Sequence, residues 1–215
     1  PPNFQLCYNN NCGVVNQSIT LNKVVGNLPN GQPNGSPVIT GCSNQLTICN
    51  GGSLPGYREW WYEGVVTLNT TCNFWRFWVA LSARNAGIGN LVNSGSQNIF
   101  VETTFNNTGG FNIHNSPTIT SPPISYYCLN QPAFAYYTAT DANGDSLSYE
   151  SIAPSNNPIG CGVNAPNNIF AAPYTTLNPF PTGNTFYVNP VNGVITFTPT
   201  ALGKWEKKKK IKQYR

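Results

Sequence analysis

The chain has 215 residues, of which 8% are charged, and it contains 32 Asn, 20 Gly and 18 Pro. These three residue types disfavour helix interiors, which argues against a helical bundle or a helix-rich enzyme. The net charge of +4 is uneven: residues 204–215 carry seven basic and one acidic residue (+6), and the rest carry four basic and six acidic residues (−2). A nucleic-acid binder spreads its basic residues over a binding face, so no nucleic-acid partner is expected. No apolar run approaches the ~18–20 residues of a membrane span.

The first half of the chain is predicted to form strands joined by turn-rich loops. Alternation of residue types, or clustering of aromatic residues, predicts strands at residues 14–25, 57–68, 74–83 and 99–105. The segment 74–83 is the strongest, because Trp75 and Phe77 lie on one face and Trp78 lies on the other. Aromatic residues on both faces predict a central strand that is covered on both sides. Asn, Gly and Pro make residues 27–37 a loop.

The second half is predicted to form a separate β-domain. Residues 115–123 are dense in Pro, Ser and Thr, which predicts a boundary between domains 1–116 and 117–215. Strands are predicted at residues 124–128, 134–140, 146–152, 185–188 and 194–198. The last two flank Asn192-Gly193, a pair that tolerates positive φ and is typical of a hairpin turn. Two small β-domains account for the length, and the predicted fold class is all-β.

Seven cysteines, most of them in the first domain, favour an oxidising, extracellular location in a chain this poor in charge. One His and the lack of Cys-x-x-Cys spacing argue against a typical zinc site. The close pairs Cys7/Cys12 and Cys42/Cys49 would close short loops, and Cys42–Cys49 is a tentative pair, although spacing does not establish the pattern. An odd number leaves one thiol free or bonded outside the chain. The start at Pro1, without a Met or a signal peptide, predicts a processed piece of a longer protein.

Catalytic chemistry finds little support in the sequence. His114 is the only candidate general base, and it lies in an Asn-rich loop without a Gly-x-Ser-x-Gly motif. A glycosidase needs two carboxylates about 5–9.5 Å apart across a cleft. No spacing singles out a pair among Glu59, Glu63, Glu102 and Glu150. We therefore predict a protein that is not an enzyme, and a cleft with two such carboxylates would revive a glycosidase-related function.

A run of three aromatic residues supports an alternative function. Trp60, Trp61 and Tyr62 would suit a surface on which sugar rings stack, as in a carbohydrate-binding module. Aromatic residues in a strand are more often part of the core. Exposure of these rings would favour sugar binding, and burial would argue against it.

The clearest local pattern is the acidic turn at residues 141–145. Asp141, Asn143 and Asp145 place side-chain oxygens at every second position, and Gly144 allows the chain to curl. Calcium takes about 6–8 oxygen ligands, so the turn would supply part of a calcium shell. The Glu that would complete an EF-hand loop is missing. The competing interpretation is a plain β-turn whose Asp and Asn side chains cap their own backbone.

Two sets of motifs resemble bacterial surface proteins. Residues 140–149 and 188–199 resemble bacterial cadherin-like and Ig-like modules, with an acidic turn followed by a Gly-x-Ile-x-Phe-x-Pro strand. Upstream motifs resemble large Bacteroidetes cell-surface proteins that are labelled gliding-motility-associated or PKD-like and that carry a type IX secretion signal. These motifs are Cys49-Asn50-Gly51-Gly52, Tyr62-Glu63-Gly64-Val65-Val66-Thr67-Leu68, Cys72-Asn73-Phe74-Trp75, Ala83-Arg84-Asn85 and Glu102-Thr103-Thr104. Their order along residues 40–205 is more specific than any single motif.

The resemblance implies two tandem Ig-like or cadherin-like β-sandwiches, exported and displayed on the cell surface. It implies no catalytic residues. An O-glycan at Ser146 is implied because Asp145-Ser146-Leu147 fits the family's glycosylation pattern, although a turn without a glycan is an equal alternative. The family's last strand is apolar and alternating, whereas residues 206–210 read Glu-Lys-Lys-Lys-Lys. Because that would place charge on a buried face, we expect the second domain to be truncated or poorly defined after residue 205.

These observations predict a non-enzymatic structural or adhesive module of an extracellular bacterial adhesin or filament. Its expected partners are like subunits or neighbouring modules of the same protein, and polysaccharide or the cell surface. Calcium at the acidic turn would stiffen the module, and no other cofactor is expected. No transmembrane segment is predicted.

Overall fold

The structure is a computed structural model, and it describes residues 4–28, 31–38, 46–53, 56–108, 115–120, 126–162 and 166–214. Every regular element among these residues is a β-strand, except one short 3-10 helix, Ser94–Ser96. The prediction of an all-β fold is therefore confirmed. Within the described ranges, no helix is long and apolar enough to cross a membrane. The chain divides into two compact units.

The division between the units differs from the predicted boundary between residues 116 and 117. Unit 1 comprises residues 1–79 and 102–108, and unit 2 comprises residues 80–101 and 109–215. The segment 80–101 therefore belongs with the C-terminal part of the chain. Hydrogen bonds within unit 2 hold it there, such as the one from Gly89 N–H to Lys204 O at 2.8 Å. The Pro-rich composition near residue 116 gave no sign of this long-range contact.

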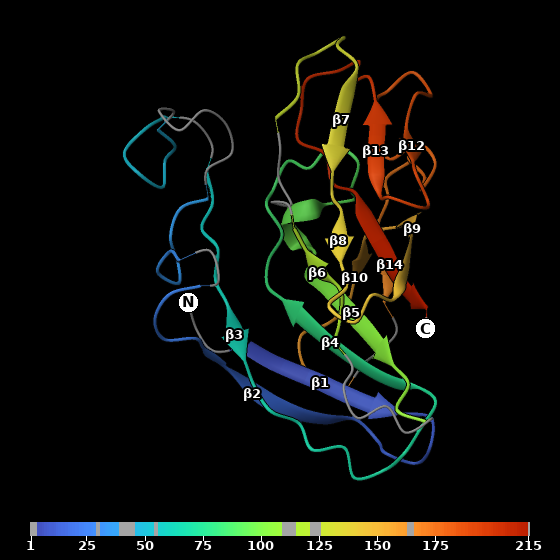
Figure 1. The fold of residues 1–215 in the computed structure, drawn as a ribbon. Helices are drawn as coiled ribbons and strands as arrows, with labels where there is room; N and C mark the ends of the chain where they lie inside the picture. The colour runs from blue at the N-terminus through green and yellow to red at the C-terminus, as the bar shows by residue number, and fades with distance from the viewer. Residues whose placement is uncertain are drawn as a thin grey trace. The chain divides into compact units, whose positions relative to one another are not determined.

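A five-stranded sheet contains most of the regular structure of unit 1 (Figure 1). Its strands are β1 (Phe4–Asn10), β2 (Gln17–Lys23), β3 (Tyr62–Glu63), β4 (Trp75–Leu81) and β5 (Ile99–Phe105), in the order β3-β2-β1-β4-β5. The strands predicted at residues 74–83 and 99–105 are confirmed as β4 and β5. The strand predicted at 57–68 is reduced to the two residues of β3, and β1 was not predicted.

Aromatic side chains of β1 and β4 pack against each other. Tyr8 lies opposite Phe77 in the antiparallel register, and their ring centroids are 5.9 Å apart. Trp75 and Trp78 are 2% and 1% exposed. These two residues lie on opposite faces of β4 because side chains alternate along a strand. The prediction of a central strand that is covered on both sides is therefore confirmed.

A disulfide bond joins the two strands at one end of the β1–β4 ladder. Cys12 follows β1 and bonds to Cys72, which precedes β4 and is 1% exposed. The expected short loop between Cys7 and Cys12 is therefore not formed, although Cys7 and Cys161 are both disulfide-bonded. The expectation was wrong because the antiparallel register of β1 and β4 brings Cys12 and Cys72 together across 60 residues.

The tentative Cys42–Cys49 bond is not observed either. Cys49 has a free thiol, and Cys42 lies outside the described residues. Hydrogen bonds close the turn around Cys49 instead. Asn50 N–H donates to Thr47 O at 2.9 Å, and the Arg58 guanidinium donates to Cys49 O at 2.8 Å. These hydrogen bonds hold the turn without a disulfide at Cys49.

Unit 2 contains four small antiparallel sheets (Figure 1). Its strands are β6 (Thr118–Ile119), β7 (Ala133–Tyr136), β8 (Ala139–Thr140), β9 (Ser146–Ile152), β10 (Ser155–Asn156), β11 (Asn167–Asn168), β12 (Tyr187–Val188), β13 (Val194–Phe197) and β14 (Lys208–Tyr214). The sheets are β12-β13-β7, β14-β9, β10-β11 and β6-β8. The predicted strand 146–152 is β9, and the predicted strand 134–140 is split into β7 and β8. Of the predicted strand 124–128, residues 124 and 125 lie outside the described residues, and 126–128 are not extended into a sheet.

The core of unit 2 lies on one face of the β12-β13-β7 sheet. Ala135, Phe180, Ile195 and Phe197 form its buried cluster. The rings of Phe180 and Phe197 meet edge to face, with centroids 5.1 Å apart. Because Ile195 and Phe197 point into this cluster, the alternating residues of β13 point away from it.

The chain continues as a strand beyond residue 205, contrary to expectation. β14 pairs with β9 along its whole length, from Lys208 opposite Ile152 to Tyr214 opposite Ser146. The residues after 205 therefore form a regular strand, β14.

Gly193 has a backbone conformation that favours glycine, and its Cα lies close to a side chain of β9. It ends the predicted turn between β12 and β13 with φ of +72°, which favours glycine. A Cβ atom on Gly193 would lie 2.8 Å from Cδ1 of Tyr149, which is 5% exposed. The hairpin prediction is confirmed, and the turn also packs against β9.

We predict that Gly193→Ala lowers the free energy of unfolding by about 2–5 kcal/mol, because left-handed strain and overpacking add. Gly144→Ala is the matched control: its φ is +79°, but nothing lies within 4 Å of its added Cβ. It should cost about 1–2 kcal/mol from strain alone. Urea unfolding of both variants measures the difference, and equal losses would contradict the proposed packing of Gly193 on Tyr149.

Candidate functional site

The acidic turn, residues 141–145, connects β8 to β9. Asp141 Oδ1 accepts hydrogen bonds from the N–H of Asn143 at 2.8 Å and of Asp145 at 3.1 Å. Asn143 Oδ1 accepts from the backbone and side-chain nitrogens of Asn115, both at 3.2 Å. These contacts are those of a turn whose side chains cap its backbone. Asn115 therefore engages the side-chain oxygen of Asn143, and the backbone of the turn engages one carboxylate oxygen of Asp141.

The other two ligands converge on Gln213 of β14. Its Nε2 donates to Asp145 Oδ2 at 2.7 Å and to Asp141 Oδ2 at 2.9 Å, and it lies 3.1 Å from Asn115 O. A side-chain amide has two N–H bonds, so one nitrogen cannot fully satisfy three acceptors. The nitrogen thus occupies a point toward which two carboxylates and one carbonyl are directed. Gln213 could not be recognised from the sequence, because it is 68 residues from Asp145 and no local motif marks it.

This oxygen-only set fits calcium in kind but not in number. Calcium takes about 6–8 oxygens, and two carboxylates with one carbonyl provide half of that or less. Among the residues that the structure describes, no three His, Cys, Asp or Glu side chains gather at one point. Further ligands would have to come from backbone oxygens or water.

One side of β14 carries an exposed ionic cluster. Glu150 of β9 lies opposite Lys210 in the register. Its carboxylate is 3.8 Å from Lys210 Nζ and 3.1 Å from Lys212 Nζ. The hydrogen bond to Glu150 raises the pKa of Lys212. Because these groups are exposed to solvent, the pairs contribute little to stability.

The opposite side of β14 places lysines over aromatic rings. Lys207 Nζ lies 4.0 Å from the ring centroid of Tyr137, and Lys209 Nζ lies 4.6 Å from that of Tyr149. Burial, and secondarily repulsion from Lys209, lowers the pKa of Lys207 to about 7. Burial lowers the pKa of Lys209 to about 8. The strand forms despite four adjacent lysines because alternation sends two of them to this side, where ring faces partly compensate the lost hydration.

The three predicted sugar-stacking residues do not form one exposed surface. Trp60 is half-buried, with Lys23 Nζ 4.2 Å from its ring centroid. Tyr62 is half-buried against Phe4, at a centroid distance of 4.5 Å. Trp61 is 42% exposed, and it is the one of the three that offers an open ring. A stacking platform at this position is therefore not supported.

The remaining predicted residues have different surroundings. Ser146 is exposed at the start of β9, where a modifying enzyme would reach it. Glu102 forms an ion pair with Arg76 at 2.6 Å. His114 lies outside the described residues.

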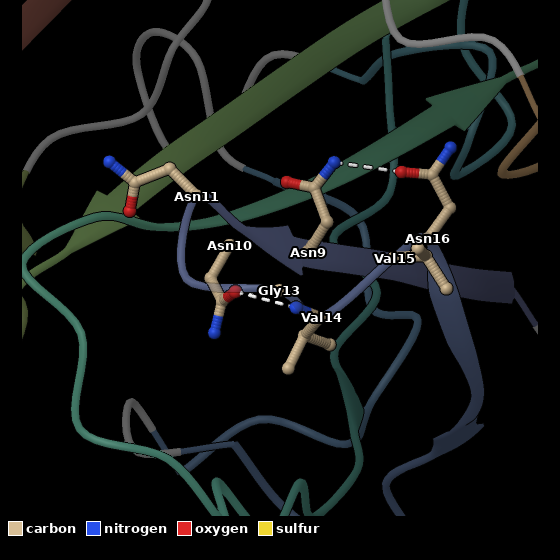
Figure 2. A pocket seen from close by; sticks show the side chains of 7 residues that line it. All are labelled: Asn9, Asn10, Asn11, Gly13, Val14, Val15 and Asn16. Atoms are coloured by element: carbon tan, nitrogen blue, oxygen red, sulfur yellow. Dashed lines mark hydrogen bonds between the residues drawn. The ribbon is translucent and has the colours of Figure 1, made fainter.

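An amide-lined pocket lies at the turn between β1 and β2 (Figure 2). It is lined by Asn9, Asn10, Asn11, Gly13, Val14, Val15 and Asn16. Asn9 Nδ2 donates to Asn16 Oδ1 at 2.7 Å, and Val14 N–H donates to Asn10 Oδ1 at 2.9 Å. Several of its polar groups therefore serve the turn itself. No lining side chain titrates, so the pocket supplies no acid or base.

No protein-family model, curated protein or solved structure matches this chain.

We predict that stability rises between pH 7 and pH 9. The pKa of Lys207 is about 7 when folded and 10.5 when unfolded, so the unfolded state binds more protons in this window. The contribution of Lys207 to this rise is about 2 kcal/mol, equivalent to several degrees in Tm. Thermal melts at the two pH values measure it.

Two variants control this measurement. Lys207→Met should raise Tm at pH 7 and flatten the pH dependence, leaving the smaller part due to Lys209. Lys210→Met, at a position whose side chain is 52% exposed, should keep the wild-type pH dependence. A pH dependence that Lys207→Met leaves intact would contradict the burial of this ammonium.

Proposed function

We propose that this chain is a non-enzymatic structural or adhesive module of an extracellular bacterial surface protein, with its two units as Ig-like or cadherin-like β-sandwiches. The observation that carries the proposal is the Cys12–Cys72 bond at the end of the β1–β4 ladder. Disulfides persist in oxidising, extracellular settings. The exported, surface-displayed setting that the sequence motifs imply is of this kind.

The Cys12–Cys72 bond raises stability by lowering the conformational entropy of the unfolded chain. It closes a loop with a sequence separation of 60, which in the chain-entropy description is equivalent to about 4 kcal/mol. It also holds the ends of β1 and β4 in register. A module that spaces or anchors other parts of a surface protein has to stay folded outside the cell. Proteases there cleave the unfolded state, so a module that rarely unfolds survives longer.

A buried ion pair holds two distant segments of unit 2 together. Arg84 pairs with Glu206, and the Arg84 side chain is 3% exposed. The second guanidinium nitrogen of Arg84 donates to Ser155 O at 2.7 Å. Asn90, fully buried, accepts from Glu206 N–H at 3.0 Å. Breaking such a buried pair by removing one partner is strongly destabilising, so the segment 80–101 is fixed to the start of β14.

We expect the variant Cys12→Ser/Cys72→Ser to lose about 2–4 kcal/mol of unfolding free energy. Its digestion by proteinase K under native conditions should be at least about tenfold faster, since cleavage follows the population of the opened state. Cys49→Ser, which removes a free thiol, is the matched control and should digest like the wild type. Digestion of the double variant at the wild-type rate would contradict the structural role of the bond.

A second measurement addresses the non-enzymatic part of the proposal. The intact chain should release no reducing sugar from a panel of polysaccharides. A turnover that Glu102→Gln abolishes would contradict the proposal, because it would assign a reaction to an acid that here pairs with Arg76.

Calcium at the acidic turn is part of the proposed function, supported by the convergence of Asp141, Asp145 and the Asn115 carbonyl. We expect millimolar calcium to raise Tm relative to chelator, and Asp145→Asn to remove the shift. Gln213→Glu should melt lower in chelator, because three carboxylates then face one another, and should gain more from calcium. Glu63→Gln, at an exposed acid of unit 1, is the control and should keep the wild-type shift. Coincident wild-type melts would show that the turn binds no calcium.

A further inference from the structure

The β12-β13-β7 sheet turns aromatic side chains outward. Thr196 of β13 lies opposite Phe134 of β7 and opposite Tyr187 of β12, so these three residues share a face. Tyr136 shares this face, opposite Val194. Phe134, Tyr136 and Tyr187 are 56%, 61% and 53% exposed. We call these three rings the aromatic face.

The rings are held outward by the packing of the other side of the sheet. Ala135, Ile195 and Phe197 alternate with the outward residues and are buried in the core of unit 2. A slip of one residue would bury the rings and expose the core, so the register prevents the rings from turning inward. Three large aromatic residues exposed together on one sheet face are the kind of surface that marks a binding site.

The aromatic face carries no charge. The strands β7, β12 and β13 contain no Asp, Glu, Lys or Arg. Lys207 approaches the rings of Tyr137 and Phe197, which pack with the core on the other side of the sheet. An anionic ligand such as a nucleic acid depends on cations at its binding surface. The surface is therefore suited to a neutral ligand.

The aromatic face is too small to hold a second copy of the chain. A fully buried aromatic side chain covers roughly 150–250 Å², so three rings exposed by about half offer roughly 300 Å². A stable protein interface needs about 800 Å² on each partner. A slender ligand that touches the rings one after another fits this area better than a protein surface.

The spacing of the rings favours an extended chain of sugars. Phe134 and Tyr187 are two strand spacings apart, about 10 Å, and Tyr136 is about 7 Å from Phe134 along β7. Thr196, which carries a hydroxyl group, lies between Phe134 and Tyr187 on the middle strand. A pyranose ring has an apolar C–H face that stacks on an aromatic ring and a rim of hydroxyl groups that bond to Thr and Tyr hydroxyls. One sugar would cover one ring, whereas an oligosaccharide would reach two or three.

We propose that the aromatic face binds a neutral polysaccharide, which runs across the strands and stacks sugar rings on Tyr187 and Phe134. This goes beyond the structural role proposed above and uses none of the residues that support it. It also assigns sugar recognition to residues of unit 2 in place of Trp60, Trp61 and Tyr62.

The test is co-sedimentation of the full chain with insoluble cellulose, chitin and starch. Wild-type protein should be retained by at least one of them, without loss at high salt. Phe134→Ala, Tyr136→Ala and Tyr187→Ala should each weaken the association constant roughly 2–10-fold, and the triple variant should not be retained. Tyr187→Phe keeps the ring and should bind like the wild type. Trp61→Ala removes an exposed ring elsewhere and should also bind like the wild type. Thermal melts confirm that each variant is folded.

Several results would overturn the proposal. They are retention on none of the three polysaccharides, retention that the triple variant preserves, and loss of binding in Trp61→Ala alone. Binding confined to alginate or single-stranded DNA, and lost at high salt, would assign the surface to an anion. Self-association that the triple variant abolishes, seen by analytical ultracentrifugation, would assign it to a second copy. None of these results changes the protease resistance that tests the structural role.

Discussion

The register between β9 and β14 decides which side chains of the last strand meet the core. Alternation sends Lys207 and Lys209 over the rings of Tyr137 and Tyr149, and it sends Lys210 and Lys212 to Glu150. A slip of one residue would exchange these two sets and leave ammonium groups without either a ring or a carboxylate. The same slip would remove Gln213 from the acidic turn. One pairing register therefore accounts for the buried lysines, the ionic cluster and the candidate ion site.

Strands with an apolar alternation could be predicted from sequence, and strands without one could not. Residues 74–83, 99–105 and 146–152 show the pattern, and each forms a strand there. β1 ends in Asn9 and Asn10, and β14 is rich in lysine, so both look like loop or tail. Their stability comes from partners far along the chain, which local periodicity does not report. The lysines misled the prediction because charge on a strand was weighed without the aromatic rings opposite it.

The candidate sites show the same division between local and distant information. The acidic turn was recognisable because its Asp, Asn and Gly residues are adjacent, whereas Gln213 reaches it from another strand. At the aromatic face, Phe134 and Tyr136 alternate with Ala135 and Tyr137, so both sides of β7 look apolar. The burial of Ala135 beside Ile195 decides which side faces solvent. At residues 60–62 the aromatic run was visible, but its contacts with Lys23 and Phe4 were not.

The scarcity of charge links the structural role to the proposed ligand. Among the described residues, the ion pairs Arg76–Glu102 and Arg84–Glu206 engage two of the four basic residues in the body of the chain. Outside the lysine-rich segment 204–215, the surface is poor in charge, and such a surface attracts little from a distance because long-range steering requires net charge. Recognition then depends on short-range stacking and hydrogen bonds, which bind weakly at one site. Weak sites suffice for adhesion when a surface protein presents many of them, because linked sites raise the effective concentration of each next contact. A rigid module that holds its aromatic face in a fixed orientation would favour such repeated contacts, since less ordering is needed on binding.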